Sequence, residues 1–155
     1  VRTEPAKSNA HRFNGLRVRS PATHKLIQAA DGARLLCRNV SLAKGQVLRY
    51  ACNFLCWGET PYNDFAGFGM VADDPAGYGE PLDVICDMAT LHGKGQTSQG
   101  WYEHTWRMPH PFRGTLVWIV ANGEVVSDPS NFKLSRYAYT NPPALLLDGI
   151  RVTGN

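Results

Sequence analysis

The segment Val47-Leu-Arg-Tyr-Ala-Cys-Asn-Phe-Leu-Cys-Trp-Gly-Glu-Thr-Pro-Tyr-Asn-Asp-Phe-Ala66 decides the fold class of this chain. It begins as a strand-like run rich in aromatic and branched residues and then breaks into a turn that carries Glu59 and Asp64. A second strand-like run, Ala144-Leu-Leu-Leu-Asp-Gly-Ile-Arg-Val152, contains Asp148. Because strand interiors normally exclude Asp and Glu, these three acids indicate a shared task at the edge of a sheet.

Short strand-like runs recur along the rest of the chain. Candidate strands cover residues 16–19, 24–28, 34–40, 46–57, 65–73, 82–88, 101–108, 114–120, 134–139 and 144–152. The turn signals between them include Asp31-Gly32, Lys44-Gly45, Pro75-Ala-Gly77, Asn122-Gly123 and Asp128-Pro129. No segment has convincing helical periodicity. We therefore predict an all-β fold, an antiparallel β-sandwich of jelly-roll type.

The length of 155 residues fits one domain with its own core. Residues 1–15 are polar and irregular, so we expect a flexible basic N-terminal arm beside a single domain over residues 16–155. Residues 1–26 hold six Lys or Arg and one acid, whereas the remainder holds ten Lys or Arg and twelve acids. The basic charge thus belongs to the arm, which argues against a nucleic-acid groove on the domain.

The cysteines are even in number and include no Cys-x-x-Cys pair: Cys37, Cys52, Cys56 and Cys86. This pattern favours disulfides over a zinc site. A hairpin turning at residues 44 and 45 would place Cys37 opposite Cys52. Along a strand Cys52 and Cys56 lie about 13 Å apart, too far to bond each other. We predict the bridges Cys37–Cys52 and Cys56–Cys86, the alternative being four reduced, buried thiols.

The oxidising compartment that such bridges need favours a secreted or cell-surface location. No apolar run reaches the length of a membrane-spanning helix, so we expect no membrane span.

Four polar residues are candidates to bind a structural Ca²⁺ ion through oxygen atoms: Glu59, Asn63, Asp64 and Asp148. Calcium takes six to eight oxygen ligands and tolerates loop geometry. The alternative is structural, with Asn63 and Asp64 in an Asx turn and Asp148 hydrogen-bonded at a strand bulge.

Aromatic residues divide into two groups by their position. Trp57, Tyr62 and Tyr78 lie near turns, where two sheets cannot enclose them, and are our candidates for binding a ligand by stacking. Trp101, Trp106 and Trp118 lie on candidate strands, and we expect them in the core.

Catalytic signals are weak in this sequence. His92, His104 and His110 lack the spacing that would place two imidazoles on one metal ion. Glu103 and Asp87 could approach across strands as the carboxylate pair of a glycosidase, but such proximity arises by chance among thirteen acids. We therefore expect a protein that is not an enzyme.

The order of these signals resembles a loose group of bacterial secreted β-sandwich modules, the sugar-binding-like and "choice-of-anchor" domains of adhesins. The matching elements span about residues 35–152: Ser41-Leu-Ala-Lys-Gly-Gln-Val-Leu-Arg-Tyr50, Asn53-Phe-Leu, Glu59, Pro61-Tyr-Asn-Asp-Phe-Ala66, Gly100-Trp101, Gly114-Thr-Leu and Ala144–Val152. The resemblance implies a jelly roll, in which a structural calcium often lies where the last strand meets an early loop. The chain departs from this group in its four cysteines and its slightly basic charge.

These observations lead to three functional hypotheses. The first is a non-catalytic secreted module that recognises a carbohydrate or a cell-surface partner through loops at one end. The second is a structural module that self-assembles in a surface layer, filament or shell. The third is a small glycan hydrolase.

Overall fold

The computed structural model describes residues 16–58, 62–126 and 143–154. Within them the chain forms one short helix, α1 (Met88–His92), and eight strands: β1 (Arg17–Arg19), β2 (Leu26–Leu42), β3 (Val47–Leu55), β4 (Phe65–Ala72), β5 (Glu80–Asp87), β6 (Tyr102–Arg107), β7 (Phe112–Val126) and β8 (Ala144–Thr153). Every described strand pair is antiparallel. The prediction of an antiparallel all-β fold is confirmed. In the described part of the chain no helix approaches the length and apolar character needed to cross a bilayer.

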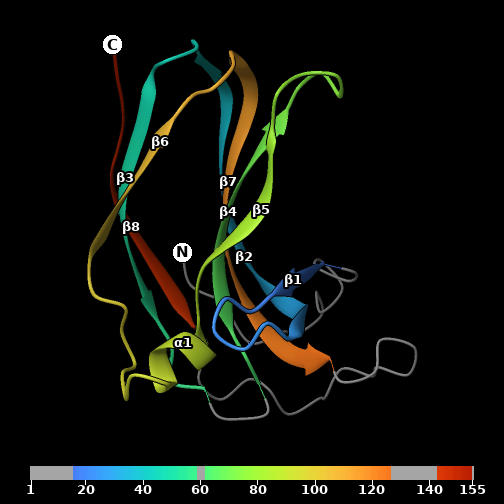
Figure 1. Cartoon of the computed structure of the whole chain (residues 1–155), viewed down its shortest axis with the longest axis vertical. Coiled ribbons are helices and arrows are strands. Elements are labelled where there is room, and N and C mark those ends of the chain that lie inside the picture. The colour runs from blue at the N-terminus through green and yellow to red at the C-terminus, as the bar shows by residue number, and fades with distance from the viewer. Residues whose placement is uncertain (1–15, 59–61, 127–142, 155) are drawn as a thin grey trace.

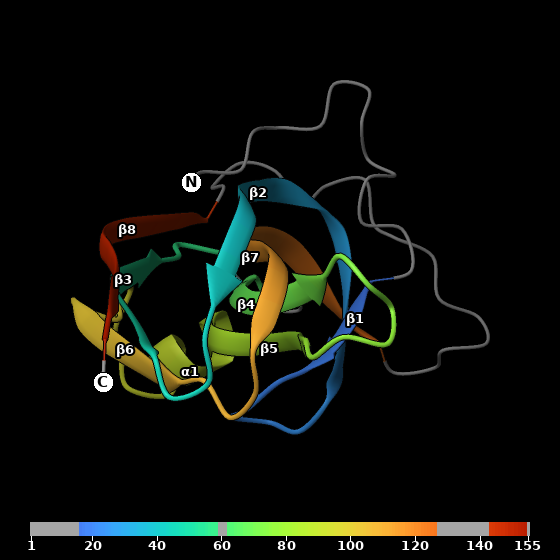
Figure 2. The ribbon, with the colours of Figure 1, turned by 90° about the horizontal axis from the view of Figure 1, so that it is seen from above.

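The strands form two sheets that face each other (Figure 1). One sheet has the order β1-β2-β7-β4-β5 and the other the order β6-β3-β8. The pairs β4 with β5, β3 with β6 and β2 with β7 are nested, because the chain folds back on itself after β4. Seen from above, the sheets curve around a common interior, and the edge strands β5 and β6 lie on the same side (Figure 2).

Alternation along the strands places apolar side chains between the sheets. Along β3 the residues Leu48, Tyr50, Cys52 and Phe54 are buried, whereas the residues between them are half-buried. Such a period of two puts one set of side chains on the inner face of a sheet. On β7 the buried Trp118 belongs to this main core, and the neighbouring Ile119 packs in a smaller cluster on the opposite face.

Two predicted turns lie inside long strands instead. Asp31-Gly32 belongs to β2 and Asn122-Gly123 to β7, where Asp31 is paired with Asn122 beside a bulge. The predicted strands 24–28 and 34–40 are therefore parts of one strand. Gly123 serves close approach, because a Cβ atom there would lie 2.6 Å from the carbonyl oxygen of Asn63. The predicted arm (1–15) and the predicted strand 134–139 lie outside the described residues.

Candidate functional site

Asn63, a predicted calcium ligand, ties the start of β4 to helix α1. Its Nδ2 donates to Asp87 Oδ2 at 2.9 Å, and its Oδ1 accepts from the backbone nitrogen of Ala89 at 2.9 Å. Asp87 caps α1 by accepting from the backbone nitrogen of Thr90 at 2.9 Å and from the Thr90 hydroxyl. Asn63 and Asp87 are both buried. Their polar atoms therefore have internal structural partners.

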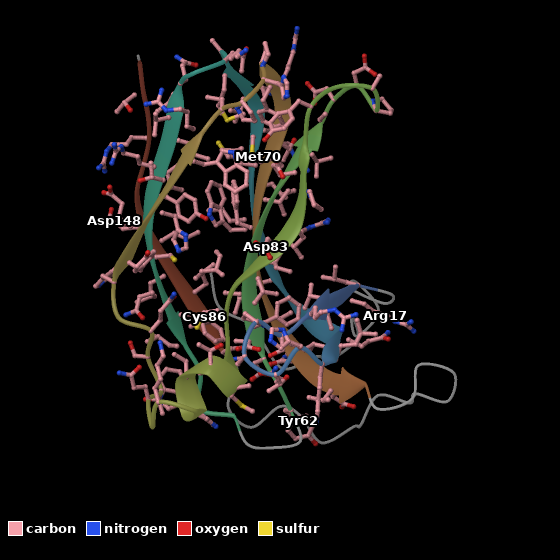
Figure 3. All side chains as sticks on the ribbon, in the orientation of Figure 1. Arg17, Tyr62, Met70, Asp83, Cys86 and Asp148 are labelled. Carbon is pink, nitrogen blue, oxygen red and sulfur yellow. The ribbon has the colours of Figure 1, made fainter. Side chains whose placement is uncertain are left out.

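Asp64 has a similar structural role. Its Oδ1 accepts from the backbone nitrogen of Gly123 at 3.1 Å, and its Oδ2 lies 3.5 Å from the Cys56 thiol, which donates to it. Asp148 lies instead on the exposed side of β8, well away from the end of the molecule that carries Tyr62 (Figure 3). There Asp148 Oδ1 accepts from the backbone nitrogen of Gly149 at 2.7 Å, beside a bulge in the pairing of β8 with β3.

The structure thus does not bring Asp148 together with Asn63 and Asp64. Glu59 lies outside the described residues. No group of three His, Cys, Asp or Glu residues within the described ranges could hold a metal ion. Calcium binding stays a prediction, and the bulge that we considered as the alternative role of Asp148 is the observed one.

The structure contains neither predicted disulfide, and all four cysteines are free. β2 and β3 belong to different sheets, so the hairpin register that paired Cys37 with Cys52 was wrong. Cys37 instead lies opposite Leu116, and Cys52 lies between Tyr102 and Leu147. Three thiols are in the main core, and burial raises the pKa of Cys52 to about 11, of Cys56 to about 12 and of Cys86 to about 11.

The predicted stacking residues do not form one site. Trp57 follows β3 and is exposed, and the half-buried Tyr62 forms an isolated bridge with Glu124. Tyr78 lies in the β4–β5 connection, at the other end of the sandwich (Figure 1). Its hydroxyl donates to Glu80, and its half-buried ring packs on the core. The three residues therefore do not share one surface, and ligand stacking by any of them stays a prediction.

A cleft of about 310 Å³ lies between the edge strands β5 and β6. It is lined by Tyr50, Phe68, Glu80, Pro81, Leu82, Asp83, Val84, Ile85, His104, Thr105 and Trp106. Each of the two edge strands ends a different sheet, so the cleft opens where the two sheets come apart. Its volume is at the lower end of the range for small-molecule sites.

Strand β6 carries a row of rings on the inner face of its sheet, Tyr102, His104 and Trp106, and the last two line the cleft. Their partners on β3 are buried residues: Cys52, Tyr50 and Leu48. Directly paired side chains lie on the same face of a sheet, so the three rings point inward. Tyr102 is nevertheless 59% exposed and Trp106 is half-buried. The inner face of β6 is therefore open to solvent over part of its length.

Stacked rings form the floor of the cleft. The imidazole of His104 stacks on Tyr50 with a centroid distance of 5.1 Å and an interplanar angle of 13°, and the rings of Phe68 and Trp118 pack against Tyr50 at 5.2 and 5.3 Å. His104 Nε2 is buried and has no hydrogen-bond partner in the described part of the chain. Burial lowers the pKa of His104, which favours the neutral imidazole. This nitrogen can bond to a ligand or to water.

The β5 side of the cleft supplies the carboxylates Glu80 and Asp83. Asp83 is paired with Phe68, whose side chain belongs to the main core, so Asp83 projects toward the space between the sheets (Figure 3). It is exposed, and its Oδ1 accepts from the backbone nitrogen of Val84 at 2.8 Å. Neither carboxylate forms an ion pair with any described residue.

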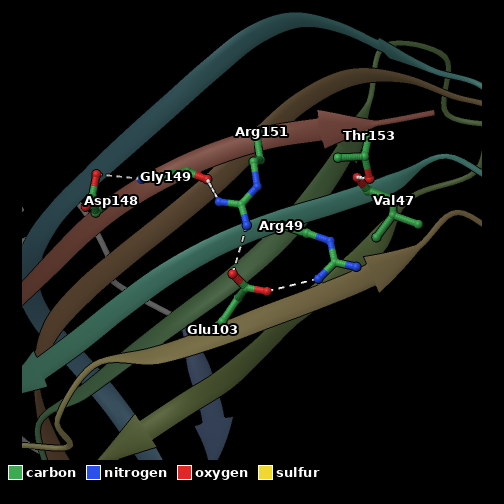
Figure 4. A network of polar contacts seen from close by, with 7 residues as sticks. All are labelled: Val47, Arg49, Glu103, Asp148, Gly149, Arg151 and Thr153. Carbon is green, nitrogen blue, oxygen red and sulfur yellow. Dashed lines mark hydrogen bonds and ion pairs between the residues drawn. The ribbon is translucent and has the colours of Figure 1, made fainter.

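On the outer face of the three-stranded sheet, unlike in the cleft, an acidic side chain is paired with basic ones. Glu103 accepts from Arg49 at 3.0 Å and from Arg151 at 2.9 Å (Figure 4). Arg49 and then Arg151 lower the pKa of Glu103 through these hydrogen bonds. Because Glu103 is on the outer face while Asp87 is buried at the α1 cap, the two cannot act as a carboxylate pair. The carboxylate pair that we considered for a glycosidase, Glu103 with Asp87, is therefore not formed.

Sequence reasoning missed most of this site. His104 was considered only as a metal ligand, and Trp106 was assigned to the core. The available signal was the alternation Tyr102-Glu-His-Thr-Trp-Arg107, which places every ring on one face of a strand. Trp118 is fully buried as predicted, whereas Trp101 is 58% exposed because it precedes β6 in a loop.

Comparisons of the chain with protein-family models, with curated proteins and with solved structures found no match. The resemblance to secreted adhesin modules therefore stays a prediction.

Proposed function

We propose that the chain is a non-catalytic binding module that recognises a carbohydrate in the β5–β6 cleft. The observation that carries this proposal is that two inward-facing rings of β6, His104 and the half-buried Trp106, line one side of the cleft while Asp83 lines the other. Sugar rings have apolar C–H faces that stack on aromatic rings, and hydroxyl groups that bond to carboxylates and imidazoles. The cleft offers both kinds of group.

The type of sandwich and the location belong to the same proposal. A jelly roll has eight strands in two packed sheets formed by a chain folded back on itself. The nested pairs β2 with β7, β3 with β6 and β4 with β5 support this fold for our chain. β1 departs from the pattern because it pairs with β2 rather than with β8. Secretion stays a prediction that the free cysteines no longer support.

A binding role accounts for the cleft better than glycan hydrolysis does. Glycosidases place two carboxyl groups on either side of the scissile bond. Glu80 and Asp83 both come from β5, and Glu80 is engaged by the Tyr78 hydroxyl. The opposite wall presents His104 and Trp106, which supply no carboxylate. Glycan hydrolysis is thus the weakest of our three hypotheses.

The test is to titrate the protein with methyl glycosides while recording NMR spectra of the backbone and of the His104 ring. We expect shifts concentrated on β5 and β6. Trp106→Ala should weaken binding by about 2 kcal/mol, near thirtyfold, as for a central interface aromatic. Trp101→Ala is the matched control because Trp101 is exposed and does not line the cleft. Equal loss in both variants, or shifts confined to another surface, would refute the site.

Self-assembly is a second candidate, favoured by strand β8. β8 is an edge strand among the described residues, and it carries three exposed apolar side chains, Leu146, Ile150 and Val152. The bulge at Asp148 and Gly149 interrupts it, which hinders pairing with another strand. Light scattering of the native protein and of Ile150→Lys tests this candidate. Loss of an oligomer only in the variant would support it.

A further inference from the structure

We propose that the carbohydrate recognised by the β5–β6 cleft carries a free amino group that is protonated at neutral pH. This inference rests on the proposed function, because it names the chemical class of ligand for the same cleft. Three observations carry it: the sign of the charges that line the cleft, their lack of counter-charges, and the rings that face them.

The charged groups of the cleft are all acidic. Among the described residues that line it, Glu80 and Asp83 are carboxylates, and there is no Lys or Arg. His104 contributes no positive charge at neutral pH because burial lowers its pKa. A ligand with a carboxylate or sulfate group would therefore meet like charges, whereas an ammonium group would meet opposite charges.

Glu80 and Asp83 lack basic partners, unlike two exposed acids elsewhere in the described structure. Glu103 is held by Arg49 and Arg151 on the outer face, and Asp73 lies 3.9 Å from Arg113. Glu80 and Asp83 have no such cation within the described residues, although the whole chain is net positive. The negative charge of Asp83 is therefore available to a ligand, and Glu80, which accepts from the Tyr78 hydroxyl, adds to the negative potential of the cleft.

The rings of the cleft favour the same class of ligand. Tyr50, Phe68 and Trp106 line the cleft together with Asp83. Aromatic faces attract cations through their quadrupole, and Trp is the strongest of them. Rings combined with a carboxylate therefore stabilise an ammonium group on a sugar ring more than the uncharged hydroxyl at the same place.

The experiment compares methyl glucoside with two analogues that each carry one change: the glucosaminide, with an amine in place of the C2 hydroxyl, and the glucuronide, with a carboxylate in place of the C6 hydroxymethyl group. They are titrated at about pH 7, below the pKa of roughly 7.7–8.0 of a comparable amine. We expect the glucosaminide to bind about fivefold more tightly than the glucoside, the upper range for an exposed ion pair. The glucuronide should bind most weakly.

Two variants assign the preference to the cleft. Asp83→Asn should remove most of the fivefold preference while the neutral glucoside still binds. Asp74→Asn is the matched control, since it removes one exposed acid in the β4–β5 connection, outside the cleft, and should retain the preference. Equal binding of all three glycosides would overturn this inference and leave the proposed function standing. No binding of any glycoside would overturn both.

Discussion

The polar cluster beneath α1 and the cleft between β5 and β6 differ in how their polar groups are partnered. Asn63, Asp64 and Asp87 are buried and bond to backbone and side-chain atoms of the protein itself. In the cleft, His104 Nε2 lacks a partner among the described residues and Asp83 lacks a counter-charge there. The polar groups of the buried cluster thus bond within the protein and stabilise the fold, whereas polar groups of the cleft remain able to bond to a ligand.

This difference shows that carboxylates beside a strand are poor evidence for a site until their partners are known. Burying a carboxylate is costly unless hydrogen bonds compensate, so a buried acid in a stable fold is already engaged. An exposed acid beside an open aromatic surface is hydrated and does not need partners within the protein.

Asp87→Ala should lower the free energy of unfolding by about 3–5 kcal/mol, because it leaves Asn63 Nδ2 and the backbone nitrogen of Thr90 without partners. Urea unfolding followed by fluorescence gives this value. Asp87→Asn keeps an acceptor for Thr90 and should cost less. Asp83→Asn, on the cleft, should cost almost nothing. Equal costs for Asp87→Ala and Asp83→Asn would remove the contrast between the two regions.

The buried thiols should make stability fall at high pH. Burial raises the pKa values of Cys52, Cys56 and Cys86 from 9.0 to about 11, 12 and 11. The stability that these thiols contribute is fully present below pH 9, where they are protonated in both the folded and the unfolded state. It is lost as the pH rises through their pKa values in the folded state. Unfolding free energies should therefore fall between about pH 9 and 12. Cys86→Val removes one titrating thiol and should flatten this slope; an unchanged slope would contradict the assignment.

Thiol labelling should separate one cysteine from the other three. Cys37 is exposed, whereas the remaining cysteines are buried with raised pKa values, so only Cys37 should react quickly near neutral pH. Intact mass after labelling should show one adduct on the native protein and four in denaturant. Fewer than four adducts in denaturant without reductant would instead reveal a disulfide.

His104→Phe should leave stability unchanged or raise it slightly, because it keeps a ring beside Tyr50 and removes a buried nitrogen without a partner. Binding of a glycoside should weaken by about 1 kcal/mol, near fivefold, if Nε2 bonds to the ligand. Melting temperature and NMR titration measure the two effects separately. A large loss of stability would mean that His104 belongs to the core.

Glu103→Gln should change stability least, since Glu103 and its partners Arg49 and Arg151 all lie on an exposed face. Because its pKa is lowered in the folded state, Glu103 contributes at neutral pH, and this contribution disappears as the pH falls below the ordinary value of 4.5. Thermal melts of both proteins at neutral and at acidic pH should differ only slightly, and less at acidic pH. A marked loss at neutral pH would give this outer face a structural importance that its exposure does not indicate.

Part of this protein could be predicted from single residues and their period. The apolar run at Val47–Leu55 predicted a strand without any knowledge of neighbouring strands, and the structure shows Tyr50 and Phe54 on its buried face. The turns at Lys44-Gly45 and Pro75-Ala-Gly77 were also correct, because Pro fixes φ and Gly adopts the positive φ that Gly45 has here. Local chemistry therefore determined the class of fold and most strand positions.

The neighbours of each strand, and with them the site, became apparent from the folded chain and not from any local pattern. Lys44-Gly45 joins β2 to β3 across two sheets, so Cys37 and Cys52 do not face each other. Trp106 is half-buried because β6 is an edge strand that faces β5, the edge strand of the other sheet. Which side chains share a face of a strand follows from the order of the residues alone, since it depends on backbone geometry. What each face meets depends on long-range packing, which no local pattern encodes.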